Sequence, residues 1–163
     1  MQSRGLELAL WTWLPADAAG VKGTVVVFHG LGAHARFPSV ALAAELLVQK
    51  SYRVCAIDFP GHGESPGMRG YIESADTLIV DGINSVQAVL KIARGGSTVI
   101  APDAPLFLLG SSMGGAIAVE VATGLAAMEV QVAGLVLLAP MLGPVSTLML
   151  LSFGTSKDRY PPY

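Results

Sequence analysis

The sequence contains few charged residues for its length. Charged residues make up 13% of the 163 positions and hydrophobic residues 52%, whereas about a quarter of a typical soluble domain is charged. This composition favours a sheet covered on both faces, a membrane protein, or part of a larger domain. The net charge is -2 and no basic run is present, which argues against nucleic-acid binding because that function needs a positive surface.

Cysteine and histidine are also scarce. One cysteine and three histidines are too few for a disulfide framework or a clustered metal site. We therefore expect no metal and no cofactor. Cys55 lies in the apolar run RVCAID, which predicts a buried, unreactive thiol.

Neither of two apolar segments has the full pattern of a leader or a membrane span. In residues 1–20 the apolar stretch is interrupted by Glu7 and alternates as a strand would. Residues 130–156 carry no charge, but Pro140 and Pro144 break the segment in its middle. A strand followed by an apolar loop is the better interpretation. We expect a protein that is cytoplasmic or peripheral to a membrane.

Short apolar runs alternate with longer segments of helical periodicity. Most of the runs are unbroken and apolar, and that over residues 24–28 is rich in β-branched residues. Unbroken apolar runs are typical of strands buried on both faces. Glycine and proline mark their ends. The expected strands are 6–14, 24–28, 53–59, 106–109 and 135–139, and the expected helices are 38–50 with Ser39 as N-cap, 74–94 and 113–128.

This alternation predicts an α/β fold: a mostly parallel sheet of about five strands with helices on both faces. In such sheets ligands bind at the carboxyl ends of the strands. Three glycine-containing loops follow predicted strands, with the sequences HGLGAH, DFPGHGES and GSSMGG. We expect the chemistry of the protein to lie in these loops.

The loop GSSMGG contains a candidate nucleophile. Its first five residues match G-x-S-x-G with Ser112 at the centre, a spacing that suits a tight strand-to-helix turn carrying an exposed serine hydroxyl. Gly110 and Gly114 would keep Cβ atoms away from that turn. Ser111 is a poorer candidate because the equivalent flanking positions hold Leu109 and Met113. The alternative is an ordinary glycine-rich turn with a serine that does no chemistry.

The loop HGLGAH could supply the other half of an acyl-transfer site. The backbone N–H of Leu31 could converge with that of Met113 on one oxyanion, and two such donors suffice. Gly30 and His29 would support the loop. For the His29 side chain a turn role is favoured over catalysis, because its place in the backbone already explains it.

The loop DFPGHGES allows two interpretations. Asp58 and His62 could act as an acid and a base, or they could tie down a tight glycine-rich turn with their polar side chains. The composition of the loop accounts for these residues without catalysis. We favour the turn.

Three segments together resemble a known family. FHGLGAH, DFPGHGESPGMRGYI and LLGSSMGGAIA, in this order within residues 24–140, look like the monoacylglycerol lipase and lysophospholipase-like branch of the α/β-hydrolase fold, the serine aminopeptidase S33 type. The resemblance implies Ser112 as nucleophile and the amides of Leu31 and Met113 as oxyanion hole, with Gly115 in the supporting turn. It also implies that His34 lies near the site. The implied reaction is hydrolysis of an acyl ester whose chain lies in an apolar channel under a mobile cap.

The sequence departs from that family in its catalytic triad. The family's aspartate and histidine follow the serine along the chain, but no histidine follows Ser112, and the later acids are Glu120, Glu129 and Asp158. None occupies the family's acid position, so triad acid and base are absent from this chain. We expect residues 1–140 to form the N-terminal half of a hydrolase core and residues 141–163 to begin an apolar cap that is truncated.

The sequence thus predicts a serine ester hydrolase acting on acylglycerols or similar lipid acyl esters, with an incomplete triad. The 163 residues alone should be inactive or very weak, because a serine without a base is a poor nucleophile. One alternative is a catalytically inactive fragment or lipid-binding module; another is a hydrolase of other esters, thioesters or peptides. Expected partners are a lipid or small acyl ester and, through the cap, a membrane surface.

Overall fold

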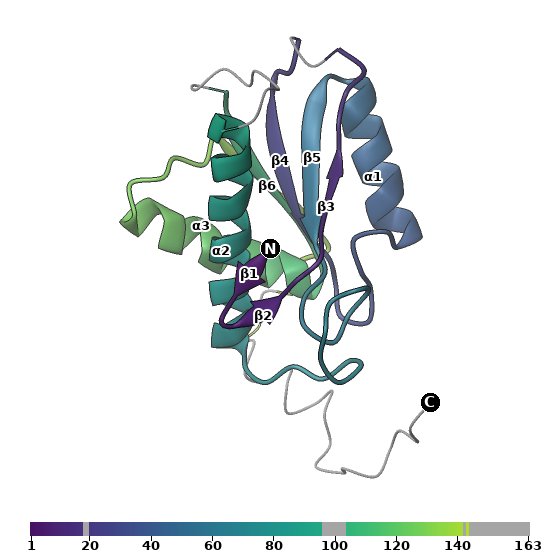
Figure 1. The fold of residues 1–163 in the computed structure, drawn as a ribbon, viewed down its shortest axis with the longest axis vertical. Coiled ribbons are helices and arrows are strands. Elements are labelled where there is room, and N and C mark those ends of the chain that lie inside the picture. Colours follow the sequence, from purple (N-terminus) through teal and green to yellow (C-terminus); the bar gives the residue numbers. More distant parts are fainter. Residues whose placement is uncertain (18–19, 96–103, 142, 144–163) are drawn as a thin grey trace.

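A five-stranded sheet with helices on both faces forms the centre of the protein (Figure 1). The computed structural model describes residues 1–17, 20–95, 104–141 and 143. Along the sheet the strands follow the order β3-β5-β4-β6-β7. Four neighbouring strands are parallel, and only β3 runs antiparallel to its neighbour β5. This is the α/β architecture that the sequence predicted, a mostly parallel sheet with helices on both faces.

Apart from the N-terminal strand, the strands begin and end close to the predicted positions. The central strands consist almost wholly of buried side chains, as is typical of unbroken apolar runs. Because successive side chains alternate between the faces, Val26 and Phe28 belong to one core while Val25 and Val27 belong to the other. The bounds are β3 Leu10–Trp13, β4 Gly23–Phe28, β5 Tyr52–Ile57, β6 Leu106–Ser111 and β7 Gly134–Leu138.

In the described part of the chain, three helices cover the sheet. On one face α1 (Pro38–Gln49) packs against β5 and β3, and on the other α2 (Ala75–Gly95) and α3 (Met113–Ala127) pack against each other and the sheet (Figure 1). The buried face of α3 is lined with small residues, which lets this helix lie close to β6. Cys55 is buried at the α2 and α3 face, and burial raises the pKa of its thiol, as expected for an unreactive cysteine.

The N-terminal segment differs from its prediction as one strand over residues 6–14. Instead β1 (Gln2–Ser3) and β2 (Leu6–Glu7) form a separate hairpin, and only β3 joins the main sheet. The turn uses Arg4 and Gly5, both with positive φ (+48° and +79°). The hairpin is attached to α2, because Asp81, fully buried, accepts hydrogen bonds from Ser3 and Arg4.

The predicted cap of α1 is wrong. The N-cap is Phe37, which makes no side-chain capping bond, and Pro38 occupies the first turn in place of the expected Ser39 cap. Proline suits this position because its fixed φ matches the helix and its missing N–H has no partner there.

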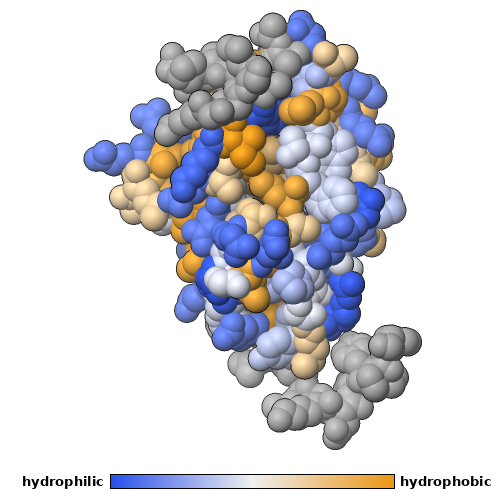
Figure 2. All heavy atoms as spheres, viewed as in Figure 1, coloured by the Kyte–Doolittle hydropathy of each residue, from blue (hydrophilic) through white to orange (hydrophobic). Residues whose placement is uncertain are grey.

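The strand β7 lies at the edge of the sheet. Three of its apolar side chains, Leu135, Val136 and Leu138, are 38%, 47% and 46% exposed, in contrast to the buried central strands. In the view of Figure 2, hydrophilic and hydrophobic residues are interspersed, with the larger hydrophobic groups in the upper half. None of the helices in the described ranges is both long and apolar enough to cross a membrane. Most of the predicted cap, residues 144–163, lies outside those ranges.

Candidate active site

The backbone of Ser112 has an unusual conformation. This residue stands between the end of β6 and the first residue of α3, with φ 52° and ψ -118°. Non-glycine residues rarely adopt such angles, and where they do the site is often functional. The side chain is exposed, and within the described residues its hydroxyl has no hydrogen-bond partner. The turn therefore presents a free hydroxyl at the carboxyl end of the parallel sheet.

The glycines around Ser112 are required by close packing. A Cβ built on Gly110 would lie 2.7 Å from the Cα of Gly115, and one on Gly114 would lie 2.6 Å from the carbonyl oxygen of His29. Real Cβ atoms do not approach other heavy atoms so closely. The G-x-S-x-G spacing thus reflects how tightly the β6–α3 turn packs against itself and against the end of β4.

The loop after β4 lies directly beside the serine. A Cβ built on Gly30 would be 3.3 Å from the Cβ of Ser112 and 3.9 Å from its Oγ. The N–H of Leu31, the next residue, donates no hydrogen bond to any described residue. Met113 is the first residue of α3, where backbone N–H groups lack helical partners and the helix dipole favours negative charge. The predicted oxyanion donors thus belong to segments adjoining the Ser112 hydroxyl.

A turn that the sequence analysis did not identify holds the backbone of Ser112. The N–H of Ser112 donates to the carbonyl oxygen of Leu138 at 3.0 Å. The carbonyl oxygen of Ser112 accepts from the N–H groups of Gly115 at 2.9 Å and Met141 at 3.1 Å. The intervening Ala139 has a φ of +44°. The only signal in the sequence was Pro140 directly after a predicted strand, which marks a turn but not its contacts.

His29 has both ring nitrogens engaged in hydrogen bonds. Its Nδ1 lies 2.8 Å from the carbonyl oxygen of Gly30, and its Nε2 accepts from the N–H of Phe59 at 3.1 Å. The carbonyl can only accept, so the proton of the neutral ring is on Nδ1. Burial lowers the pKa of His29 to about 4. This neutral imidazole joins the loops after β4 and β5 and has no free lone pair for the serine proton.

Asp58 is likewise fully engaged within the protein. Its carboxylate is buried and accepts hydrogen bonds from the N–H groups of Ala35 and Glu64 and from the indole of Trp11, at 2.6, 2.9 and 3.0 Å. A Cβ on Gly63 would lie 2.7 Å from the same carboxylate. These contacts fit the turn interpretation of the DFPGHGES loop, because the acid organises backbone and faces no histidine nitrogen.

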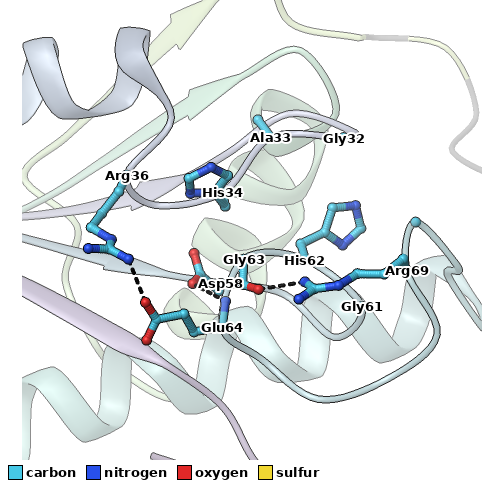
Figure 3. A pocket seen from close by; sticks show the side chains of 11 residues that line it. Gly32, Ala33, His34, Arg36, Asp58, Gly61, His62, Gly63, Glu64 and Arg69 are labelled. Atoms are coloured by element: carbon cyan, nitrogen blue, oxygen red, sulfur yellow. Dashed lines mark hydrogen bonds and ion pairs between the residues drawn. The ribbon is translucent and has the colours of Figure 1, made fainter. Parts of the chain in front are cut away.

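A hollow of about 460 Å³ lies between the loops after β4 and β5 (Figure 3). His62 lines it and is buried; its Nδ1 donates to the carbonyl of Pro60 at 2.9 Å, while its buried Nε2 has no partner among the described residues. Arg36 forms an exposed ion pair with Glu64, and Arg69 donates to the Gly63 carbonyl. His34, half-buried, lines the same hollow, and Ser112 does not.

No hydrogen bond connects Ser112 with any of the three histidines in the described part of the chain. The structure brings the serine together with the two predicted oxyanion segments, and it assigns His29 to loop support. Within the described residues, no base and no acid forms a hydrogen bond with the serine hydroxyl.

Comparison with known proteins gives consistent matches. The family described as serine aminopeptidase, S33, matches residues 19–157. The monoglyceride lipase of Mus musculus is 33% identical over 130 residues, which are 79% of this chain and 38% of that protein. Phospholipase YtpA of Bacillus subtilis (strain 168) is 31% identical over 135 residues, which are 82% of this chain and 45% of that protein.

Solved structures agree with the sequence matches. The crystal structure of the monoacylglycerol lipase of Paleococcus ferrophilus aligns with a TM-score of 0.63 and 26% identity, covering 90% of this chain and 50% of that one. The chain therefore spans about half or less of the length of the proteins it matches.

Proposed function

The chain belongs to the serine aminopeptidase S33 family of α/β-hydrolases, and from that premise we propose that the whole protein hydrolyses carboxylic esters with Ser112 as nucleophile. The observation that carries this proposal is the backbone of Ser112, held at φ 52° and ψ -118° with its hydroxyl exposed. A residue that only closed a turn would have no need of so rare a conformation.

In the proposed reaction the Ser112 hydroxyl attacks the ester carbonyl. The oxygen of that carbonyl becomes negatively charged in the tetrahedral intermediate, and the N–H groups of Leu31 and Met113 stabilise it. Two observations support this arrangement: the Gly30 loop adjoins the serine hydroxyl, and Met113 begins α3. Loss of one such donor typically costs about 3 to 4 kcal/mol of transition-state stabilisation. The intermediate then collapses: the bond to the alcohol breaks and the alcohol leaves with the proton taken from Ser112. Water hydrolyses the resulting acyl-serine, which releases the carboxylic acid and restores the serine hydroxyl.

The base that removes the serine proton is a separate part of the proposal. No histidine follows Ser112 in the sequence, and the buried His29 has no free nitrogen. We infer that the base and its acid come from regions of the whole protein that these 163 residues do not include, since the chain spans 38% of the mouse relative. Without a base, residual acceleration is limited to about a thousandfold over water.

For the substrate we infer an acylglycerol or a similar lipid acyl ester. Support comes from the names of relatives, a monoglyceride lipase and a phospholipase. The uncharged sequence of residues 141–156 also suits an apolar cap over an acyl chain and peripheral contact with a membrane. Discrimination between acylglycerols and other esters can be measured as the ratio of kcat/KM for monoacylglycerol and for a short water-soluble ester.

Covalent labelling tests the nucleophile directly. A fluorophosphonate probe reacts with activated serines, so the whole protein should be labelled at Ser112, and Ser112→Ala should abolish labelling. Ser111→Ala is the matched control, because it removes the neighbouring hydroxyl and should leave labelling intact. The 163-residue chain should label weakly or not at all. Labelling of the whole protein that survives Ser112→Ala would refute the proposal.

A second candidate function is lipid binding without turnover. The observation in its favour is that no described histidine forms a hydrogen bond with Ser112. In that case the folded chain would bind a fatty acid or monoacylglycerol at equilibrium and would not consume it. Rapid ester turnover by the same 163 residues would exclude this function.

A further inference from the structure

The two peptide groups on either side of Ser112 are held by the last residue of β7 and by the turn that follows it. The first, between Ser111 and Ser112, is fixed through the Ser112 N–H, which donates to Leu138 at 3.0 Å. The second, between Ser112 and Met113, is fixed through the Ser112 carbonyl oxygen, which accepts from Met141 at 3.1 Å and from Gly115 at 2.9 Å. Only the bond from Gly115 lies within the β6–α3 segment itself.

The second of these peptide groups carries the proposed oxyanion donor. A trans peptide is planar, so its N–H points opposite to its C=O. Whatever holds the Ser112 carbonyl oxygen therefore also sets the direction of the Met113 N–H. We propose that Met141 is a positioning residue whose backbone N–H, bound to the Ser112 carbonyl, keeps the Met113 N–H directed into the oxyanion hole. This inference rests on the proposed function.

A competing conformation explains why such a hold is needed. Ser112 has φ 52° and ψ -118°. Rotating the Ser112–Met113 peptide by a half-turn would change ψ of Ser112 and φ of Met113 together. It would bring Ser112 close to the left-handed helical region, near φ +57° and ψ +47°. That region is better populated by non-glycine residues than the observed one. The same rotation would turn the Met113 N–H away from the hole and break both bonds to the Ser112 carbonyl.

The turn is shaped for this contact. Ala139 adopts φ +44° at a bend directly after β7, and the residues on either side of this bend, Leu138 and Met141, both bond to Ser112. Pro140 packs against α3, where a Cβ on Gly115 would lie 2.7 Å from the Pro140 Cβ. The third glycine of the GSSMGG loop, Gly115, is thus explained by the approach of this turn. Met141 is also the first residue of the predicted cap. The hydrogen bond from its N–H to the Ser112 carbonyl therefore connects the start of the predicted cap with the proposed oxyanion hole.

The test removes the Met141 N–H with a proline, which also fixes φ at that position. In the whole protein, Met141→Pro lacks the N–H while Met141→Leu keeps it with a similar side chain. We expect kcat for a short-chain nitrophenyl ester to fall between about tenfold and about a hundredfold in the proline variant only, because complete loss of an oxyanion donor costs about 10² to 10³. KM should hardly change, since the donor acts on the developing charge. Affinity for a trifluoromethyl ketone, which forms an oxyanion with the serine, should fall in parallel.

A second pair of variants guards against misfolding of the first. Ala139→Val places a β-branched residue at φ +44° and should release the turn, whereas Ala139→Gly accepts this φ without strain. Hydrogen exchange gives an independent readout: the Met141 amide should be protected in the unsubstituted protein and in Ala139→Gly, and it should exchange faster in Ala139→Val.

The outcomes separate the two proposals. If the unsubstituted whole protein shows no labelling of Ser112, the proposed function fails. If that protein is active and Met141→Pro matches Met141→Leu in kcat, only the role of Met141 is refuted. An unprotected Met141 amide in the active protein would refute it as well.

Discussion

Lowering the pH should destabilise this protein through His29, and a His29 variant can separate this effect from that of other titrating groups. The imidazole is buried, donates from Nδ1 to Gly30 and accepts at Nε2 from Phe59. A second proton on Nε2 would face the Phe59 N–H and would be far from water. Burial accordingly lowers the pKa of His29 from 6.5 to about 4.

The sign and size of the effect follow from linkage. Between pH 6.5 and about 4 the unfolded chain protonates this histidine and the folded protein does not, so the free energy of unfolding falls as the pH falls through that window. Each pKa unit corresponds to 1.36 kcal/mol. The difference between 6.5 and about 4 therefore amounts to about 3 kcal/mol, a large share of the 5 to 15 kcal/mol stability of a typical domain.

The assay compares the protein with His29→Gln. Urea unfolding followed by the fluorescence of Trp11 and Trp13 gives the free energy of unfolding at several pH values from 7.5 to 4. Carboxylates titrate in the same range, but they contribute to both proteins and cancel in the difference. We expect the unsubstituted protein to lose about 3 kcal/mol more than His29→Gln. Parallel pH profiles would refute the argument, even if His29→Gln is less stable at every pH.

Two further changes test the packing of the β6–α3 turn and of the N-terminal hairpin. Gly110→Ala should lower the free energy of unfolding by about 1 to 3 kcal/mol, because its Cβ would lie 2.7 Å from the Cα of Gly115; urea unfolding should show no such loss for Gly143→Ala, where a Cβ meets nothing within 4 Å. Arg4→Met should cost about 3 kcal/mol in the same measurement, because it leaves the buried Asp81 carboxylate without its cation. A loss below 1 kcal/mol, as expected for an exposed ion pair, would show that Asp81 does not depend on Arg4.

Local sequence predicted the features that depend on neighbouring residues. The β-branched run 24–28 became β4, and the helical periodicity after Ser112 became α3. The G-x-S-x-G spacing predicted the β6–α3 turn at Ser112. A turn packed this tightly needs glycine on both sides of the serine, and that need depends on neighbouring residues. The exception at short range was the cap of α1, where Pro38 rather than Ser39 sets the start of the helix.

The sequence did not decide the role of His29 or predict the N-terminal hairpin, because both depend on contacts between residues far apart in the chain. His29 could be a turn residue or a base, and its state depends on the N–H of Phe59, thirty residues away. The N-terminal hairpin exists because Asp81, on a distant helix, binds Ser3 and Arg4. Contacts of this range leave no periodic signal in one sequence.

The amino-acid sequence by itself determined the alternation of strands and helices, the family resemblance and the position of Ser112 in its turn. These features follow from local patterns of apolar residues and glycine. The tertiary structure decided which groups remain free to react and which are held: it buried His29 in the neutral state, engaged Asp58 with three donors, and placed Met141 against the Ser112 carbonyl. Those outcomes depend on how β4, β5, β6 and β7 align side by side, and that alignment is fixed only when the whole sheet assembles.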